Sequence, residues 1–164
     1  MRTLVDANVV LRYMLRDDKN QFPTAERTIQ EGAFLLPEVL AEIVYVLLGV
    51  YSVPREDIAS RLQILVKEVQ SEHPDILTTA LSTFGTTKLD FIDCLLAAYN
   101  NHLGDKVVSF DRKLNRSLQQ ITVQRVFAAR HVEHLRHSGE DMNARPYRNA
   151  LRFVVVARFA DAPD

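Results

Sequence analysis

Four carboxylates stand out because each lies directly after a strand-like run or inside an apolar, helix-like stretch; they are Asp6, Glu42, Asp93 and Asp111. Like charges gathered in one cleft raise each other's pKa unless a cation joins them. Carboxylate oxygens without His or Cys partners select Mg²⁺ or Mn²⁺ rather than zinc. An ion held in this way activates water and shields a phosphodiester during in-line attack. If the four side chains converge, the sequence predicts a metal site for phosphoryl chemistry.

Each acid also has a structural interpretation. Asp6 and Asp111 precede helix-like runs, so either can be an N-cap that accepts backbone N–H bonds. Asp90 and Asp93 have the spacing of a capping box, although Asp93 shares a helix face with apolar residues and is expected to point inward. Glu42 has no basic residue within a helical turn. Its alternative is a position at the edge of the buried face, paired with a Lys or Arg from elsewhere.

Two kinds of apolar pattern alternate along the chain and indicate the elements that would position these acids. Short β-rich runs predict buried strands at residues 3–5, 33–36, 106–110 and 121–123. Helical spacing bounded by Pro, Gly and polar caps predicts helices at about residues 9–14, 25–32, 37–49, 54–66, 74–84, 90–103 and 111–114. This alternation predicts an α/β fold in which helices flank a central parallel sheet. Ligands bind such sheets beyond the carboxyl ends of the strands.

Composition excludes several classes of protein. The chain has 164 residues, 47% hydrophobic and 25% charged, which fits one folded domain and excludes global disorder. Its formal charge of −1 excludes a broadly basic nucleic-acid binder. The single cysteine, Cys94, permits no internal disulfide and no Cys-based zinc site. The acid at position six interrupts any signal-peptide core, and the apolar run from Ile43 to Val53 is too short for a bilayer. We therefore expect a cytoplasmic protein without a membrane span.

The four acidic blocks, in their order, resemble the PIN-domain ribonucleases and, within them, the VapC-type toxins of bacterial toxin–antitoxin pairs. The blocks that carry the resemblance are residues 4–13, 37–42, 91–98 and 109–111. The resemblance covers residues 1–126 and implies a PIN-like α/β/α sandwich. Residues 127–164 form a C-terminal extension of unknown role, which contains arginine but no lysine and whose run 151–156 has strand character.

The resemblance implies a metal-dependent endoribonuclease that leaves a 5′ phosphate and a 3′ hydroxyl. Asp6, Glu42, Asp93 and Asp111 would ligate Mg²⁺ or Mn²⁺, with Asp90 as an outer acid. Asn8 and Ser109 would orient ligands or water through hydrogen bonds. The family also implies a homodimer and a small antitoxin whose C-terminal segment covers the active site.

An acidic site repels RNA, so cations near it must help. Arg12, Lys88 and Arg112 flank the acidic blocks and are candidates for phosphate contacts; Arg16, Lys113 and Arg116 are others. Each of them can equally be solvated surface charge. The RNA is expected to be single-stranded or looped, because attack needs access to one phosphodiester.

Other functions fit less well. A receiver-type signalling domain needs paired acids after its first strand, where Asp6 stands alone, and a haloacid-dehalogenase-type phosphatase needs Asp where Asn8 stands. The five glycines form neither a P-loop nor a dinucleotide fingerprint. The alternative that stays open is a non-catalytic module on the same scaffold that binds RNA or a protein partner.

Overall fold

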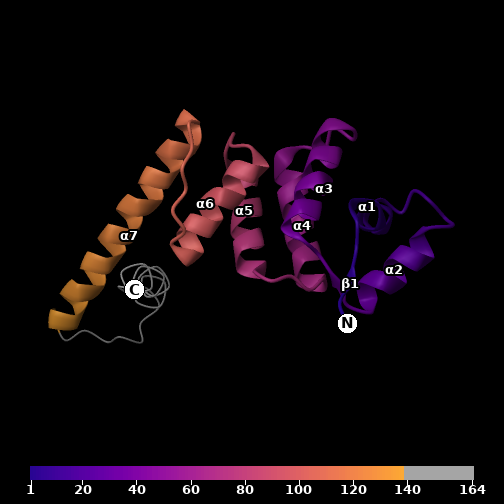
Figure 1. Ribbon diagram of the computed structural model, residues 1–164, viewed down its shortest axis with the longest axis horizontal. Coiled ribbons are helices and arrows are strands. Elements are labelled where there is room, and N and C mark those ends of the chain that lie inside the picture. Colours follow the sequence, from indigo (N-terminus) through magenta and orange to yellow (C-terminus); the bar gives the residue numbers. More distant parts are fainter. Residues whose placement is uncertain (139–164) are drawn as a thin grey trace. The chain divides into compact units, whose positions relative to one another are not determined.

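Strands and helices alternate at the start of the chain and give way to helices alone in this computed structural model, which describes residues 1–138 (Figure 1). The elements are β1 (Thr3–Leu4), α1 (Ala7–Leu15), α2 (Phe22–Gln30), β2 (Ala33–Phe34), α3 (Pro37–Gly49), α4 (Arg55–Glu68), α5 (Pro74–Thr86), α6 (Phe91–Leu103) and α7 (Arg112–Ser138). The chain divides into two units, residues 1–95 and residues 96–164, with the border inside α6.

A small parallel sheet in the first unit joins β1 to β2. Thr3 pairs with Ala33 and Leu4 with Phe34. Gln70 continues the pairing beyond β2, since its backbone N–H and C=O bond Ala33 and Leu35 at 2.8 Å each. The connection from β1 to β2 passes through α1 and α2, as a parallel pairing requires. The fold is therefore α/β as predicted, although most of it is helical.

The helices begin where the sequence supplies a start signal. Pro37 and Pro74 stand at the first helical positions of α3 and α5, where the missing N–H costs nothing. Glu56 and Asp57 lie in the first turn of α4, where negative charge suits the helix dipole. These boundaries confirm the predicted helices of residues 37–49, 54–66 and 74–84 within a few residues.

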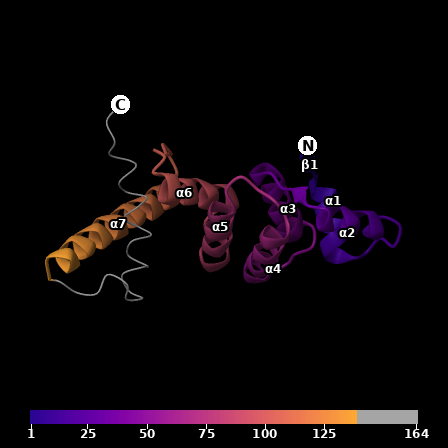
Figure 2. The ribbon, with the colours of Figure 1, turned by 90° about the horizontal axis from the view of Figure 1, so that it is seen from below.

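The core of the first unit lies where α3, α4 and α5 pack. Figure 1 and Figure 2 both show α4 beside α5. Their approach is so close at Gly85 that a Cβ there would lie 2.8 Å from the Cβ of Ala59. Phe84 and Phe91 are fully buried and meet edge to face, with ring centroids 5.6 Å apart.

The Arg55 guanidinium lies 3.7 Å from the centroid of the Phe84 ring. It also donates hydrogen bonds to the carbonyl oxygens of Phe84 and Leu89, so it fixes the end of α5 and the loop before α6.

Two of the predicted strands are wrong. Residues 106–110 have no regular secondary structure, and residues 121–123 lie inside α7. Neither strand of the described residues belongs to the unit that contains residues 106–110, and a strand without a partner is not stable. Val108 and Phe110 in this run are therefore largely exposed. No Pro or Gly interrupts residues 112–138, so the helix that begins after Asp111 continues through 121–123 instead of ending near Leu114.

Helix α7 also runs across the predicted boundary between residues 126 and 127. The strand character predicted for residues 151–156 lies outside the described residues. Within residues 1–138, none of the helices combines the length and apolar character needed to span a membrane.

Candidate active site

Asp6 lies just beyond the carboxyl end of β1 and caps α1. Its backbone is extended, and its Oδ1 accepts a hydrogen bond of 2.9 Å from the backbone N–H of Val9. The capping interpretation of Asp6 is therefore confirmed. The cap occupies one carboxylate oxygen, while the residue as a whole is exposed. Asp6 thus starts α1 and lies at the carboxyl end of β1.

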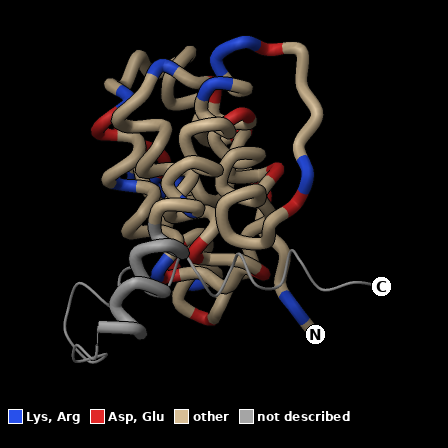
Figure 3. Tube along the Cα trace, turned by 90° about the vertical axis from the view of Figure 1, so that its left-hand side faces the viewer, with Lys and Arg blue, Asp and Glu red and all other residues tan. Residues whose placement is uncertain are grey.

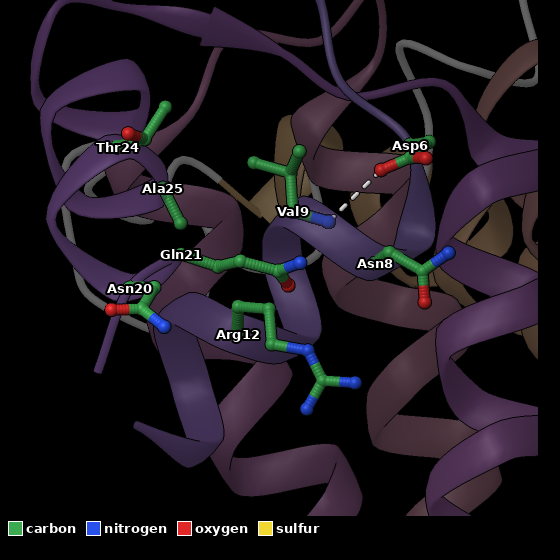
Figure 4. Close-up of a pocket in the computed structure, with 8 residues that line it drawn as sticks. All are labelled: Asp6, Asn8, Val9, Arg12, Asn20, Gln21, Thr24 and Ala25. Carbon is green, nitrogen blue, oxygen red and sulfur yellow. Dashed lines mark hydrogen bonds between the residues drawn. The ribbon is translucent and has the colours of Figure 1, made fainter. Parts of the chain in front are cut away.

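A pocket of about 360 Å³ opens beside Asp6, between α1 and the start of α2 (Figure 4). Two residues with predicted roles, Asn8 and Arg12, line it from α1. The remaining lining residues are Val9, Asn20, Gln21, Thr24 and Ala25. The Asp6 side of the molecule therefore combines a carboxylate, a guanidinium and several amides around one cavity.

The charge of Arg12 is compensated inside the protein. Its Nη1 lies 2.6 Å from Oδ2 of Asp17, in a partly exposed ion pair. The hydrogen bond with Arg12 holds the pKa of Asp17 below its ordinary value, and the same bond raises the pKa of Arg12. Arg12 is therefore a fixed rather than a freely mobile cation at the rim of the pocket.

Glu42 is exposed on α3 rather than buried on its apolar face. Its neighbours Ala41 and Ile43 are buried, so the helix turns Glu42 outward and removes the desolvation cost that the sequence suggested. Among the side chains described, residues 1–127, Glu42 makes no ion pair, so the alternative of a pairing with Lys or Arg is not borne out.

Tyr45, one helical turn after Glu42, connects α3 to the acids at the start of α6. Its hydroxyl donates a hydrogen bond of 2.5 Å to Oδ1 of Asp90. Burial and this hydrogen bond raise the pKa of Tyr45 to about 12, with a smaller contribution from the negative charge of Asp93. Asp90 therefore bonds Tyr45, and the charge of Asp93 is close enough to raise its pKa. The α6 acids thus lie against the part of α3 that follows Glu42.

The acids at the start of α6 differ from each other. Oδ1 of Asp90 also accepts the backbone N–H of Ile92 at 3.0 Å, so its predicted capping role is confirmed. Asp93 is half-buried. The next residue, Cys94, is fully buried in the core, and burial raises the pKa of its thiol to about 11.

Asp111 lies in the second unit and caps α7. Its Oδ1 accepts the backbone N–H of Lys113 at 2.7 Å and of Leu114 at 2.9 Å, and these bonds lower the pKa of Asp111. The Ser109 hydroxyl accepts the N–H of Asp111 at 3.0 Å, while the amide of Asn115 donates to the Ser109 carbonyl at 2.9 Å. Ser109 therefore shapes the loop that carries Asp111.

The donor types fit a hard divalent cation, because exposed carboxylate oxygens are what Mg²⁺ and Mn²⁺ prefer. Among the residues that the structure describes, no three His, Cys, Asp or Glu side chains are placed together to hold a metal ion. Asp6, Glu42 and Asp93, all in the first unit, therefore do not form a three-ligand cluster.

The described Lys and Arg residues are spread along the chain and do not gather beside one of the acids. Figure 3 shows Lys and Arg interspersed with Asp and Glu along the chain. Lys88 lies two residues before Asp90, and Arg112 directly follows Asp111; both are exposed. Arg16 ends α1 with a left-handed backbone, and its guanidinium lies 5.1 Å from the Phe22 ring centroid. Each unit thus has an exposed cation next to one of its acids.

Several residues of this site were not predicted. The turn residues Asn20 and Gln21 line the pocket without having been predicted. The available signal was two adjacent amide residues that lie between Asp17 and Asp18 and the start of the next helix. The role of Tyr45, whose hydroxyl bonds Asp90, was also not predicted. The available signal was that Tyr45 lies three residues after Glu42 on one helix, where two such side chains are neighbours.

Comparison with known families matches residues 3–117 to the family described as PIN domain. This match includes Asp6, Glu42, Asp93 and Asp111 and ends within α7. Neither the curated proteins nor the solved structures give a match.

Proposed function

The chain belongs to the PIN domain family, a family of nuclease folds, and we propose that it is a metal-dependent endoribonuclease that hydrolyses RNA phosphodiesters. The observation that carries this proposal is the family match, because it spans all four acidic positions in their expected order. The position of Asp6 supports it, since ligands of parallel α/β sheets bind beyond the carboxyl ends of the strands.

We assign the catalytic acids to Asp6, Glu42, Asp93 and Asp111, which would hold Mg²⁺ or Mn²⁺. When bound, the ion would supply activation of water and stabilisation of negative charge. Carboxylates repel each other without an ion between them, so their approach and ion binding are expected to be coupled. Asp90 would serve as an outer acid, held in place by Tyr45. Asn8 would orient a ligand or water, and Ser109 would set the position of Asp111.

The proposed reaction adds the oxygen of water to phosphorus and breaks the bond between phosphorus and the 3′ oxygen. The leaving oxygen takes up a proton, so the products carry a 5′ phosphate and a 3′ hydroxyl. Lys88 and Arg112 are the preferred candidates for phosphate contacts, because they are exposed next to acids of the site. Arg12 would contact RNA from the pocket, although Asp17 compensates its charge.

We further propose that the nuclease occupies residues 1–126 and acts as a VapC-type toxin that inhibits translation or growth. The four motif blocks support this subtype. Exposed apolar side chains at and just after the end of α3 would suit a homodimer contact or a cognate antitoxin; they are Leu48, Val50 and Tyr51. Expression of the chain alone should arrest growth of its host, whereas normal growth would contradict the toxin role and leave the nuclease proposal standing.

A non-catalytic module that binds RNA or a partner is the second candidate. The observation that favours it is that the described acids form no three-ligand group. Such a module would bind single-stranded RNA or protein. It would cleave no RNA with or without divalent ions, and the carboxylate variants would behave like the wild type.

The test is cleavage of labelled single-stranded RNA by the purified protein. We expect cleavage with Mg²⁺ or Mn²⁺, its loss in EDTA, and its loss in the Asp93→Asn variant. Asp75→Asn is a matched control, because Asp75 is also an aspartate in the first turn of a helix and is exposed. Equal cleavage by wild type and Asp93→Asn would overturn the assignment of Asp93. Binding without cleavage by either protein would favour the non-catalytic module.

A further inference from the structure

Three side-chain amides surround the pocket beside Asp6, namely those of Asn8, Asn20 and Gln21 (Figure 4). Figure 4 shows the Gln21 side chain extending from its turn towards α1, so the amides come from both sides of the cavity. A volume of about 360 Å³ lies at the lower end of the range for small-ligand sites. The pocket therefore has room for one nucleoside-sized group.

The turn that carries two of these amides is held by its backbone. Oδ1 of Asp18 accepts the backbone N–H of Asn20 at 2.9 Å and of Gln21 at 3.0 Å. Among the residues described, no side-chain hydrogen bond is formed by the amides of Asn8, Asn20 or Gln21. The protein thus fixes the turn without using these amides, which leaves their donors and acceptors available to a ligand.

The charges of the lining favour a neutral ligand over a phosphate. Asp17 compensates Arg12, and the carboxylate of Asp6 remains at the rim. Arg12 is the one Lys or Arg among the lining residues, and Asp17 already pairs with it, so the lining offers a phosphate no unpaired cation. A nucleobase carries no charge, and its edge presents alternating donors and acceptors that match those of primary amides. Bases that are recognised in this way must be unstacked and unpaired, as in single-stranded or looped RNA.

We propose that this pocket binds one unpaired nucleobase next to the scissile phosphodiester and thereby sets the base preference of cleavage. The inference rests on the proposed nuclease function, because Asp6 is both a wall of the pocket and one of the proposed catalytic acids. Asn20 and Gln21 are then specificity residues that contact the base without taking part in the hydrolysis.

The test compares the double variant Asn20→Ala/Gln21→Ala with Gln30→Ala, which removes an exposed glutamine that lies on α2 but does not line the pocket. Single-stranded RNA randomised in sequence is cleaved, and base frequencies are read at each position around the cut. In parallel, fluorescence anisotropy measures binding of short RNAs that differ at the preferred base, with the Asp93→Asn variant as the non-cleaving background. Thermal unfolding checks that the pocket variant is folded.

We expect wild type and Gln30→Ala to favour one base at one position beside the cut. The double variant should lose that preference and bind the preferred RNA about tenfold more weakly, the scale of losing one good base contact. An unchanged preference in the double variant, or no preference in wild type, would overturn the inference while the nuclease proposal stands. If wild type cleaves nothing but Asp93→Asn binds with a base preference that the pocket variant loses, the pocket is upheld and the nuclease proposal fails.

Discussion

Substitution of Asp6 separates its capping role from its proposed catalytic role. In Asp6→Ala, the backbone N–H of Val9 loses its 2.9 Å bond, and loss of such an N-cap costs about 1 kcal/mol. For a chain of 164 residues this lowers Tm by about 2–4 °C. In Asp6→Asn, the side-chain oxygen still caps α1, because Asn is as good an N-cap as Asp. Only the charge near the helix dipole is lost, which costs at most about 0.5 kcal/mol at physiological salt.

Activity should not follow this difference in stability. Both variants remove the carboxylate, so both should lose cleavage of single-stranded RNA by at least about 100-fold, since even residues that only support a metal ligand cost up to that much. The assay measures initial cleavage rates with Mn²⁺ at 25 °C, well below the unfolding transition, alongside Tm for each variant. Wild-type cleavage by Asp6→Asn together with a lower Tm for Asp6→Ala would show that Asp6 is only a helix cap and not a catalytic acid.

Four further predictions follow from the packing, the thiol, the second cap and the proposed metal site. Gly85→Ala should destabilise the protein by about 1 kcal/mol because the new Cβ meets the Cβ of Ala59 at 2.8 Å. Gly49→Ala should stabilise it by about 0.5 kcal/mol because a Cβ there has nothing within 4 Å. The two urea midpoints should therefore shift in opposite directions, and a shift in the same direction would contradict this. The buried Cys94 thiol, with its pKa raised to about 11, should react with a thiol reagent only as fast as the protein opens, so a fast native reaction at pH 8 would be a failure. The pKa of Asp111 is lowered in the folded protein, so this carboxylate should stabilise α7 fully above pH 3.8, its ordinary pKa, and the stabilisation should disappear as the pH falls through the lower folded pKa. Circular dichroism should show a loss of helicity in that acid range, and Asp111→Asn should make the loss smaller. Millimolar Mn²⁺ should raise the Tm of wild type but not of Asp93→Asn, and equal shifts would place the ion elsewhere.

The helices of this chain were predictable because local signals define their ends. Pro37 and Pro74 start helices, and Asp6, Asp90 and Asp111 cap them, all through contacts within a few residues. Strands depend on distant partners instead. The run 106–110 has the composition of a strand but no strand partner among the described residues of its unit, so composition alone was misleading.

The candidate site was predictable as a set of positions but not as an arrangement. The order of the acids in the sequence suffices for the family resemblance, whereas the exposure of Glu42 depends on which face of α3 is buried by other helices. Asn20 and Gln21 were missed because their turn is organised by Asp18 through backbone bonds, which leave no pattern in hydrophobicity.

The most direct test of the account is the position of a bound divalent ion. Anomalous scattering from Mn²⁺-soaked crystals would locate the ion without reference to activity. We expect a peak within about 2.1 Å of carboxylate oxygens of Asp6 and Asp93, with Glu42 or Asp111 bound directly or through water. A peak remote from both Asp6 and Asp93, or an ordered site at these acids that takes up no Mn²⁺, would contradict the claim that they form a metal-dependent nuclease centre.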